Sequence, residues 1–261
     1  MEVFVRKYLV FSIFVLFVLA IFNCSNDSTG PDSNGNQPPY GTVTDIDGNV
    51  YQTLVIGDQE WMVENLKVTH YRNGDPIPHL TDNSDWTSTT DGAYCYYDNS
   101  SANGDIYGAL YNWYAVGDSA VGDSIGIAPE GWHVPTDEEI MELEMYLGMT
   151  YEEANNTGWR GTNEGSKLSG NADLWTDGAL ENDPEFGSSG FDFLSGGYRN
   201  GNNGSFGSLS NNGYFWSSTE DNSDTAWGRN VYYDNAGVDR NYVNDGRYGF
   251  YVRCVRSVES K

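Results

Sequence analysis

Apolar and polar residues mostly alternate in short runs along the chain, a pattern typical of β-strands joined by tight turns. Residues 41–55 predict two strands joined by a hairpin turn at 47–49, and residues 61–66 can continue the same sheet. From residue 196 onward the pattern returns, with turns that contain Asn and Gly between the last three strands. These later strands are predicted at residues 213–218, 226–233, 238–243 and 248–255.

The clearest helix signal lies at residues 137–147. Thr136 and Glu139 have the spacing of a capping box, in which each side chain accepts a hydrogen bond from the other residue's backbone N–H. Gly148 stands where a helix commonly stops. Apolar residues recur at helical spacing along this segment, at Ile140, Leu143 and Leu147.

Two further segments have helical character. In residues 107–116, Leu110, Trp113 and Tyr114 fall on one side of a helix, and a short helix is predicted at residues 164–168. Strands towards both ends of the chain with helices between them predict an α+β fold rather than alternating β-α-β units.

The first 23 residues have the pattern of a signal peptide. Arg6 and Lys7 precede an apolar run over residues 8–22, which is 15 residues long and interrupted only by Ser12. This length suits the hydrophobic core of a signal peptide and is short for a membrane-spanning helix, which needs about 20 residues. We therefore expect residues 1–23 to direct export, with an uncleaved membrane anchor as the alternative.

The apolar run ends in a sequence that resembles a bacterial lipobox, after which a cysteine becomes the lipidated N-terminus. Cys24 is that cysteine; Ile21 fits the pattern, whereas Asn23 replaces the customary small residue. Residues 25–39 contain no apolar residue and suit a flexible tether. Residues 24–40 therefore predict a lipid-anchored tether on an outer-membrane or cell-surface lipoprotein. A periplasmic or secreted protein, released by ordinary cleavage, is the alternative.

The charge of the chain narrows the choice of partners. Its 261 residues include 38 acidic and 13 basic side chains, a formal net charge of −25. Such a protein repels phosphate backbones, so we expect no nucleic-acid partner. Between Cys24 and Ser195 there are 30 acidic and 4 basic residues, whereas 7 of each follow from Gly196. The C-terminal third can therefore present a less charged binding face, although an acidic surface that keeps an exported protein soluble explains the imbalance as well.

Two cysteines remain in the predicted domain, Cys95 and Cys254. Cys254 belongs to a predicted strand in which Phe250, Val252 and Cys254 share one face. In an oxidising compartment such a pair predicts a disulfide. It would close a loop of about 160 residues and stabilise the fold by up to about 5 kcal/mol. Two buried free thiols are the alternative.

Eight segments along the chain form an ordered set of motifs. They lie at residues 42–51, 56–57, 61–66, 107–115, 131–137, 196–199, 213–220 and 248–255. These motifs resemble, in the same order, those of the Fibrobacter succinogenes major paralogous domain, a family known mainly from exported bacterial proteins. The resemblance covers residues 41–256 and implies a major paralogous domain at residues 41–258.

The last motifs also resemble the C-type-lectin-like fold that is shared with formylglycine-generating enzymes. This resemblance implies a domain with short antiparallel strands, two main helices and long loops, whose second half displays the ligand site. It also implies that a strand near Val43 pairs with one near Val252 and closes the domain.

The residue pattern favours a protein that is not an enzyme. Formylglycine-generating enzymes use reactive cysteines in their C-terminal half, where this chain has only Cys254, on the predicted inward face of a strand. The three histidines, His70, His79 and His133, lack the spacing of a zinc site. The alternatives are a formylglycine-generating-type enzyme and a carbohydrate-active enzyme with two carboxylates across a cleft.

Calcium is the one cofactor that the sequence leaves open. Glu220, Asp221 and Asp224 place three carboxylates in one short segment, as calcium-binding lectin loops do. The segment lacks the Glu-Pro-Asn and Trp-Asn-Asp signatures of sugar-binding lectins, so a solvated loop is the alternative.

Residues 200–246 combine ten Asn with several aromatic residues and predict a recognition surface. Flat rings stack on sugars and amides hydrogen-bond hydroxyl groups. The predicted function is therefore a non-catalytic binding or adhesion module for a polysaccharide or a surface protein, with a structural envelope component as a further alternative. Burial of the same rings in the core is the competing explanation. The predicted ligand residues are Asn211, Asn212, Tyr214, Tyr232, Tyr233, Asn241 and Tyr242.

Overall fold

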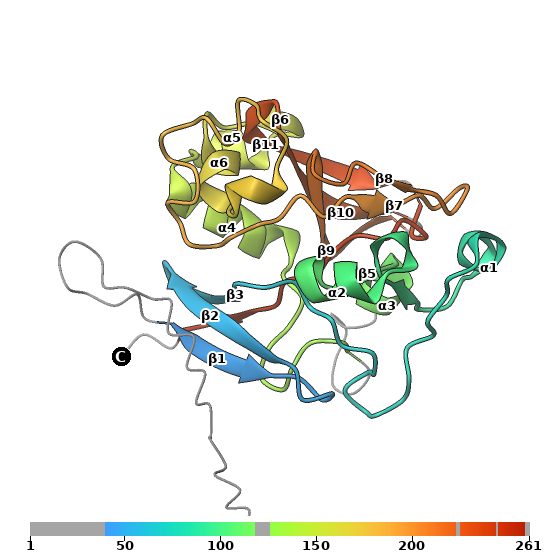
Figure 1. The fold of residues 1–261 in the computed structure, drawn as a ribbon. Helices are drawn as coiled ribbons and strands as arrows, with labels where there is room; N and C mark the ends of the chain where they lie inside the picture. The colour runs from blue at the N-terminus through green and yellow to red at the C-terminus, as the bar shows by residue number, and fades with distance from the viewer. Residues whose placement is uncertain (1–39, 118–125, 223–224, 244, 259–261) are drawn as a thin grey trace, which may run out of the picture. The chain divides into compact units, whose positions relative to one another are not determined.

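Two four-stranded antiparallel sheets and several short helices form the α+β fold that the sequence predicts (Figure 1). The predicted signal peptide and the predicted lipidation site, Cys24, lie outside the described residues. The computed structural model describes residues 40–117, 126–222, 225–243 and 245–258.

The N-terminal hairpin forms where the sequence predicts it. β1 (Gly41–Thr44) and β2 (Val50–Ile56) pair antiparallel, and Gly48 has a φ of 84° in the turn between them. The Asp45 carboxylate accepts hydrogen bonds from two backbone N–H groups of the turn and from the Tyr51 hydroxyl. These bonds hold the turn, as expected for Asp in a loop of this kind.

The C-terminus of the fold returns to this first sheet. β3 (Gln59–Met62) pairs with β2, and the last strand, β12 (Val255–Ser257), pairs with β3, so that the strand order is β1-β2-β3-β12. The implied pairing of strands near Val43 and Val252 is therefore wrong. β1, which contains Val43, occupies one edge of the sheet and β12 occupies the other.

The second sheet is built mainly from the predicted C-terminal strands. β9 (Asn212–Asn222), β10 (Thr225–Tyr232) and β11 (Asn235–Val243) follow one another as an antiparallel meander. β6 (Gly158–Arg160) adds to β11, which gives the order β6-β11-β10-β9. In contrast, the predicted strand at residues 248–255 makes only isolated bridges before β12 begins.

The longest helix, α4 (Asp137–Leu147), matches its prediction at both ends. Thr136 and Glu139 form the predicted capping box. The short helix α6 (Glu164–Leu168) is also confirmed, and it contacts β11. Figure 1 shows α4, α5 (Tyr151–Asn155) and α6 together beside the second sheet.

The helix predicted over residues 107–116 is wrong. Residues Leu110 and Tyr111 form the short strand β5, because Tyr111 pairs with Tyr94 and its backbone also bonds that of Phe250. Helical structure resumes only at α3 (Trp113–Gly117). One long helix and several short ones therefore replace the two main helices that the resemblance implies.

The remaining elements are short. Within the described ranges, none of the helices combines the length and the apolar character that crossing a bilayer requires. In chain order these elements are α1 (Asn83–Ser88), β4 (Tyr94–Cys95), the 3-10 helix η1 (Tyr97–Asn99), α2 (Ser101–Tyr107), the 3-10 helix η2 (Ala172–Leu174), β7 (Tyr198–Arg199) and β8 (Phe206–Gly207).

The predicted disulfide between Cys95 and Cys254 is wrong, because both cysteines are free and buried. Phe250, Val252 and Cys254 do share one environment, the largest core cluster, whereas Cys95 lies in a separate cluster around Trp86. Burial raises the pKa of the Cys95 thiol to about 12 and raises that of Cys254 further. The two thiols are therefore apolar parts of two cores.

Candidate functional site

The predicted ligand residues separate into two groups on the second sheet. Five of them lie where β9 begins and β10 ends, and only Asn241 and Tyr242 belong to the other end of the sheet. The five are Asn211, Asn212, Tyr214, Tyr232 and Tyr233.

The first group is largely engaged in packing. Tyr214 is 8% exposed and stacks on Phe250, so it belongs to the core rather than to a recognition surface. The Asn212 amide donates to the Tyr214 hydroxyl, and the Tyr232 ring packs edge-on against Trp159. Of these residues only Asn211 is exposed, and its side-chain oxygen accepts a hydrogen bond from Thr176.

The second group borders a hollow of about 860 Å³, called the C-terminal hollow below. This volume lies within the range of about 300–1,000 Å³ that is common for ligand sites. Strands β10 and β11, the ends of α1 and α3 and the segment 245–248 contribute to it. Its lining is Ser88, Thr89, Thr90, Tyr114, Asn202, Asn230, Asn241, Tyr242, Val243, Asp245, Gly246, Arg247 and Tyr248.

Two asparagine amides are held side by side on one face of the sheet. Asn230 in β10 lies directly opposite Asp239 in β11, and Asn241 follows two residues after Asp239 in β11. Because side chains alternate along a strand, all three side chains point to the same face of the sheet. The Nδ2 atoms of both asparagines donate to Oδ2 of Asp239, which is 6% exposed. Their carbonyl oxygens are thereby left as acceptors for hydroxyl groups of a ligand.

The segment 245–248 is fixed by residues that are distant in sequence. The indole N–H of Trp86 in α1 donates to the Arg247 carbonyl at 2.7 Å. The backbone N–H of Trp113 in α3 donates to the Gly246 carbonyl at 2.8 Å. Because of these bonds, the half-buried Tyr248 lines the hollow together with Ser88 of α1 and Tyr114 of α3.

The residues that line the hollow carry no net charge, in a chain with a net charge of −25. Its two charged lining residues pair with each other, since Arg247 Nη2 lies 2.8 Å from Asp245 Oδ2. Partial burial would raise the pKa of Asp245, but hydrogen bonds from the side chain and backbone of Arg247 outweigh it and lower that pKa. The surface that a ligand meets thus consists of amides, hydroxyls and aromatic rings.

The Tyr242 ring points to the face of the sheet opposite to the Asn230 and Asn241 amides. Successive side chains on a strand point to opposite faces, and Tyr242 packs edge-on against Trp227, which lies directly opposite it on β10. Arg240, also on that face, lies 4.0 Å from the centre of the Trp227 ring. Tyr242 therefore borders the hollow from its edge.

The predicted calcium ligands are only partly described. Glu220 and Asp221 are exposed near the end of β9, and Asp224 lies outside the described residues. Among the residues that the structure describes, no group of three His, Cys, Asp or Glu side chains is placed to hold a metal ion.

Of the thirteen residues that line the hollow, the sequence predicted only Asn241 and Tyr242 as ligand residues. Asn202 and Asn230 fall in the Asn-rich stretch 200–246, so a search for asparagines alternating with turns could have found them. Tyr114 and the segment 88–90 had no such signal, because they reach the site through long-range contacts.

Comparison with known proteins gives a family. A family model described as the Fibrobacter succinogenes major domain matches residues 54–256, which include every residue that lines the C-terminal hollow. Neither the curated proteins nor the solved structures include a match to the chain.

Proposed function

The chain belongs to the Fibrobacter succinogenes major domain family, and we propose that it is an exported, lipid-anchored envelope protein whose folded domain binds a neutral polysaccharide without catalysis. The observation that carries this proposal is the C-terminal hollow, where amides and aromatic rings converge around a compensated charge pair. An acidic polysaccharide would meet no unpaired cation there.

The chemistry of the hollow suits hydroxyl-rich ligands. The oriented amides of Asn230 and Asn241 offer acceptors, and Thr90 offers a hydroxyl that donates or accepts. The Ser88 and Thr89 hydroxyls already donate to backbone carbonyls and offer lone pairs as acceptors. The half-buried Tyr248 adds a ring on which an apolar sugar face can lie. This combination of amphipathic rings and adaptable polar groups is typical of recognition surfaces.

A C-type-lectin-like architecture is part of the same proposal. It is supported by the return of β12 to the N-terminal sheet and by the position of the hollow among the loops and strands of the second half.

The anchor and export are supported by the sequence of residues 1–40 alone. Replacing Cys24 with Ala should therefore move the protein from the membrane fraction to the soluble fraction of cells.

A thiol enzyme of the formylglycine-generating type receives no support. Such an enzyme needs an accessible thiolate, whereas Cys95 and Cys254 are buried and burial raises the pKa of both thiols.

The test of the binding function is affinity electrophoresis of the full chain in detergent micelles. Native gels would contain soluble β-glucan, galactomannan or hydroxyethylcellulose as neutral polysaccharides, and alginate as the acidic comparison. The variants are Asn230→Ala/Asn241→Ala and Tyr248→Ala. Matched controls are Asn211→Ala, outside the hollow, and Tyr146→Ala, at a ring that is 65% exposed on α4.

We expect retardation by at least one neutral polysaccharide and not by alginate. The hollow variants should lose at least about tenfold in affinity, the effect of losing one or two hydrogen bonds or a stacked ring, whereas the controls should match the parent. The absence of retardation in every neutral gel, or equal losses in controls and hollow variants, would exclude this site as the binding surface.

A further inference from the structure

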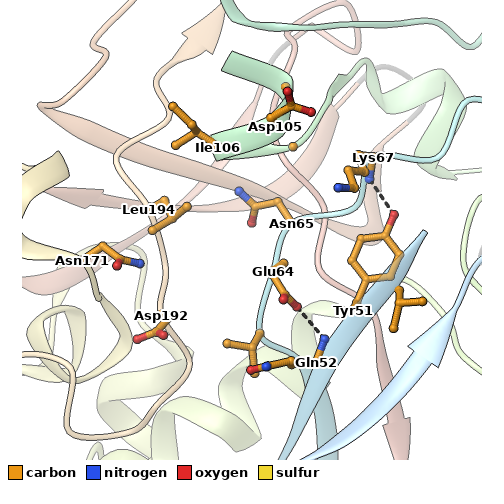
Figure 2. Close-up of a pocket in the computed structure, with 14 residues that line it drawn as sticks. Tyr51, Gln52, Glu64, Asn65, Lys67, Asp105, Ile106, Asn171, Asp192 and Leu194 are labelled. Atoms are coloured by element: carbon orange, nitrogen blue, oxygen red, sulfur yellow. Dashed lines mark hydrogen bonds between the residues drawn. The ribbon is translucent and has the colours of Figure 1, made fainter. Parts of the chain in front are cut away.

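A second cleft, of about 330 Å³, lies between β2, α2 and residues 190–194 (Figure 2). None of its lining residues lines the C-terminal hollow. The described lining residues include three carboxylates and one ammonium group, those of Glu64, Asp105 and Asp192 and that of Lys67. We call this feature the acidic cleft.

Two of the carboxylates stand on opposite sides of the acidic cleft. Figure 2 shows Asp192 on one side and Glu64 on the other. Glu64 accepts a hydrogen bond from the Gln52 backbone N–H at 2.7 Å. The Asp192 carboxylate accepts no hydrogen bond from any residue that the structure describes, although it is only partly exposed. Because no described protein donor competes for this carboxylate, the N–H groups of a ligand can bond it directly.

Burial raises the pKa of both groups. For Glu64 the Gln52 hydrogen bond and the charge of Arg253 oppose this effect, and for Asp192 the charge of Arg253 opposes it. Both carboxylates would therefore gain from a cation placed between them, because it would compensate their lost hydration.

Arg253 does not supply that compensation directly. This fully buried guanidinium donates to Asn65 Oδ1 at 2.9 Å and to the backbone carbonyls of Phe191 and Asp192. Among the described residues, no carboxylate lies within ion-pair distance of it. Arg253 thus fixes the loop that carries Asp192 and leaves the side-chain carboxylates facing the cleft.

Two exposed apolar side chains also line the acidic cleft. Val50 on β2 is 61% exposed and Ile106 on α2 is 51% exposed. A ligand that covered them would remove apolar surface from water, worth about 25 cal/mol per Å². The cleft therefore offers an alkyl chain apolar contacts and offers its cationic end two carboxylates.

We propose that the acidic cleft binds an aliphatic primary amine, with its ammonium group between Glu64 and Asp192 and its alkyl chain against Val50 and Ile106. An ammonium group has three donors and can bond both carboxylates at once. A metal ion fits less well, because no described group of three potential ligands is close enough to share one.

The test is isothermal titration of the full chain with three small probes at physiological ionic strength, about 0.15 M, where the long-range field of the acidic protein is screened. n-Butylammonium has a butyl group, a positive charge and N–H donors. 1-Butanol has the butyl group without the charge, and butyltrimethylammonium has the butyl group and the charge without N–H donors. The variants are Glu64→Gln, Asp192→Asn and the double variant. The control, Glu152→Gln/Asp173→Asn, removes the same charge at two exposed positions outside the cleft.

We expect saturable binding of n-butylammonium that is at least about tenfold tighter than that of either comparison probe, since hydrogen bonds between charged groups are among the stronger ones. Each single variant should weaken it at least about fivefold, and the control should bind as the parent does. Thermal unfolding would verify that the variants are folded.

Three results would overturn the proposal. These are no binding of n-butylammonium at millimolar concentration, equal binding of 1-butanol, and equal weakening by the control variant. Because the probes and variants differ from those of the polysaccharide test, either proposal can fail while the other stands.

Discussion

Arg229 and Glu144 form an ion pair with no exposed surface on either side chain, in which Arg229 Nε lies 2.8 Å from Glu144 Oε1. Arg229 also bonds Asp137, Arg240 bonds Asp137, and Arg160 bonds Glu144. The two acids belong to α4 and the three arginines to β6, β10 and β11. The network therefore attaches the longest helix to the sheet that carries the C-terminal hollow.

Replacing Glu144 with Gln should lower the free energy of unfolding by about 3–5 kcal/mol, because it leaves the buried Arg160 guanidinium without a counter-charge. It also leaves Arg229 with Asp137 alone as its ion-pair partner. Urea denaturation measures the change. The matched control is Glu138→Gln, the same change at an exposed position of the same helix, for which we expect a much smaller effect. Similar losses in the two variants would contradict a special role for the buried network.

The lowered pKa of Asp137 predicts how the free energy of unfolding changes at acid pH. Burial alone would raise the pKa of Asp137, but hydrogen bonds and charges from Arg240 and Arg229 outweigh it and lower that pKa. A carboxyl with a lowered folded-state pKa stabilises the fold above its ordinary pKa of about 4. This contribution is lost as the pH falls through the lower folded value.

We therefore expect the free energy of unfolding of Asp137→Asn to fall less steeply than that of the parent below about pH 5, so that the two curves converge in acid. Chemical denaturation at a series of pH values measures both curves. Parallel curves would mean that Asp137 titrates alike in the folded and unfolded chains.

The two buried thiols should be inert in the native protein. Because burial raises the pKa of Cys95 to about 12 and that of Cys254 further, neither forms a thiolate at neutral pH. Iodoacetamide should leave both unmodified in the native protein and alkylate both after denaturation without a reductant. Peptide mass mapping distinguishes them from Cys24. Loss of alkylation in the denatured, unreduced chain would reveal a disulfide.

Features held by local hydrogen bonds were predictable from the sequence. The capping box of Thr136 and Glu139 and the turn held by Asp45 are each closed within a few residues. The strands of the C-terminal meander were predictable as well, because hairpin turns join them in sequence. The Asn-rich composition also indicated the stretch that contributes Asn230 and Asn241 to the hollow.

Features set by distant contacts were not predictable. Residues 107–116 have helical spacing, but the pairing of Tyr111 with Tyr94 and Phe250 overrides it. The sequence predicts a disulfide between Cys95 and Cys254, but the two thiols lie in separate core clusters. Likewise, the acidic cleft depends on Glu64 and Asp192, which are far apart in sequence and are brought to one cleft only by the fold.

A substitution at Gly165 would test how closely α6 approaches the second sheet. A Cβ atom there would lie 2.1 Å from the carbonyl oxygen of Gly237 and 2.8 Å from that of Ala236, both in β11. The backbone of a central strand cannot move aside as a flexible side chain can, so Gly165→Ala should destabilise the fold by about 1–3 kcal/mol. This loss would occur although Ala favours a helix by up to about 1 kcal/mol over Gly.

The control for this prediction is Gly228→Ala in β10, where the nearest backbone atom to an added Cβ, the Phe215 carbonyl oxygen, lies 3.3 Å away. Both substitutions restrict the unfolded chain equally, so a larger loss in Gly165→Ala would come from the folded state, where α6 contacts β11. If Gly165→Ala were no more destabilising than Gly228→Ala, α6 would have to be able to shift on the sheet. The network that joins α4 to that sheet would then be the main attachment of the helices beside it.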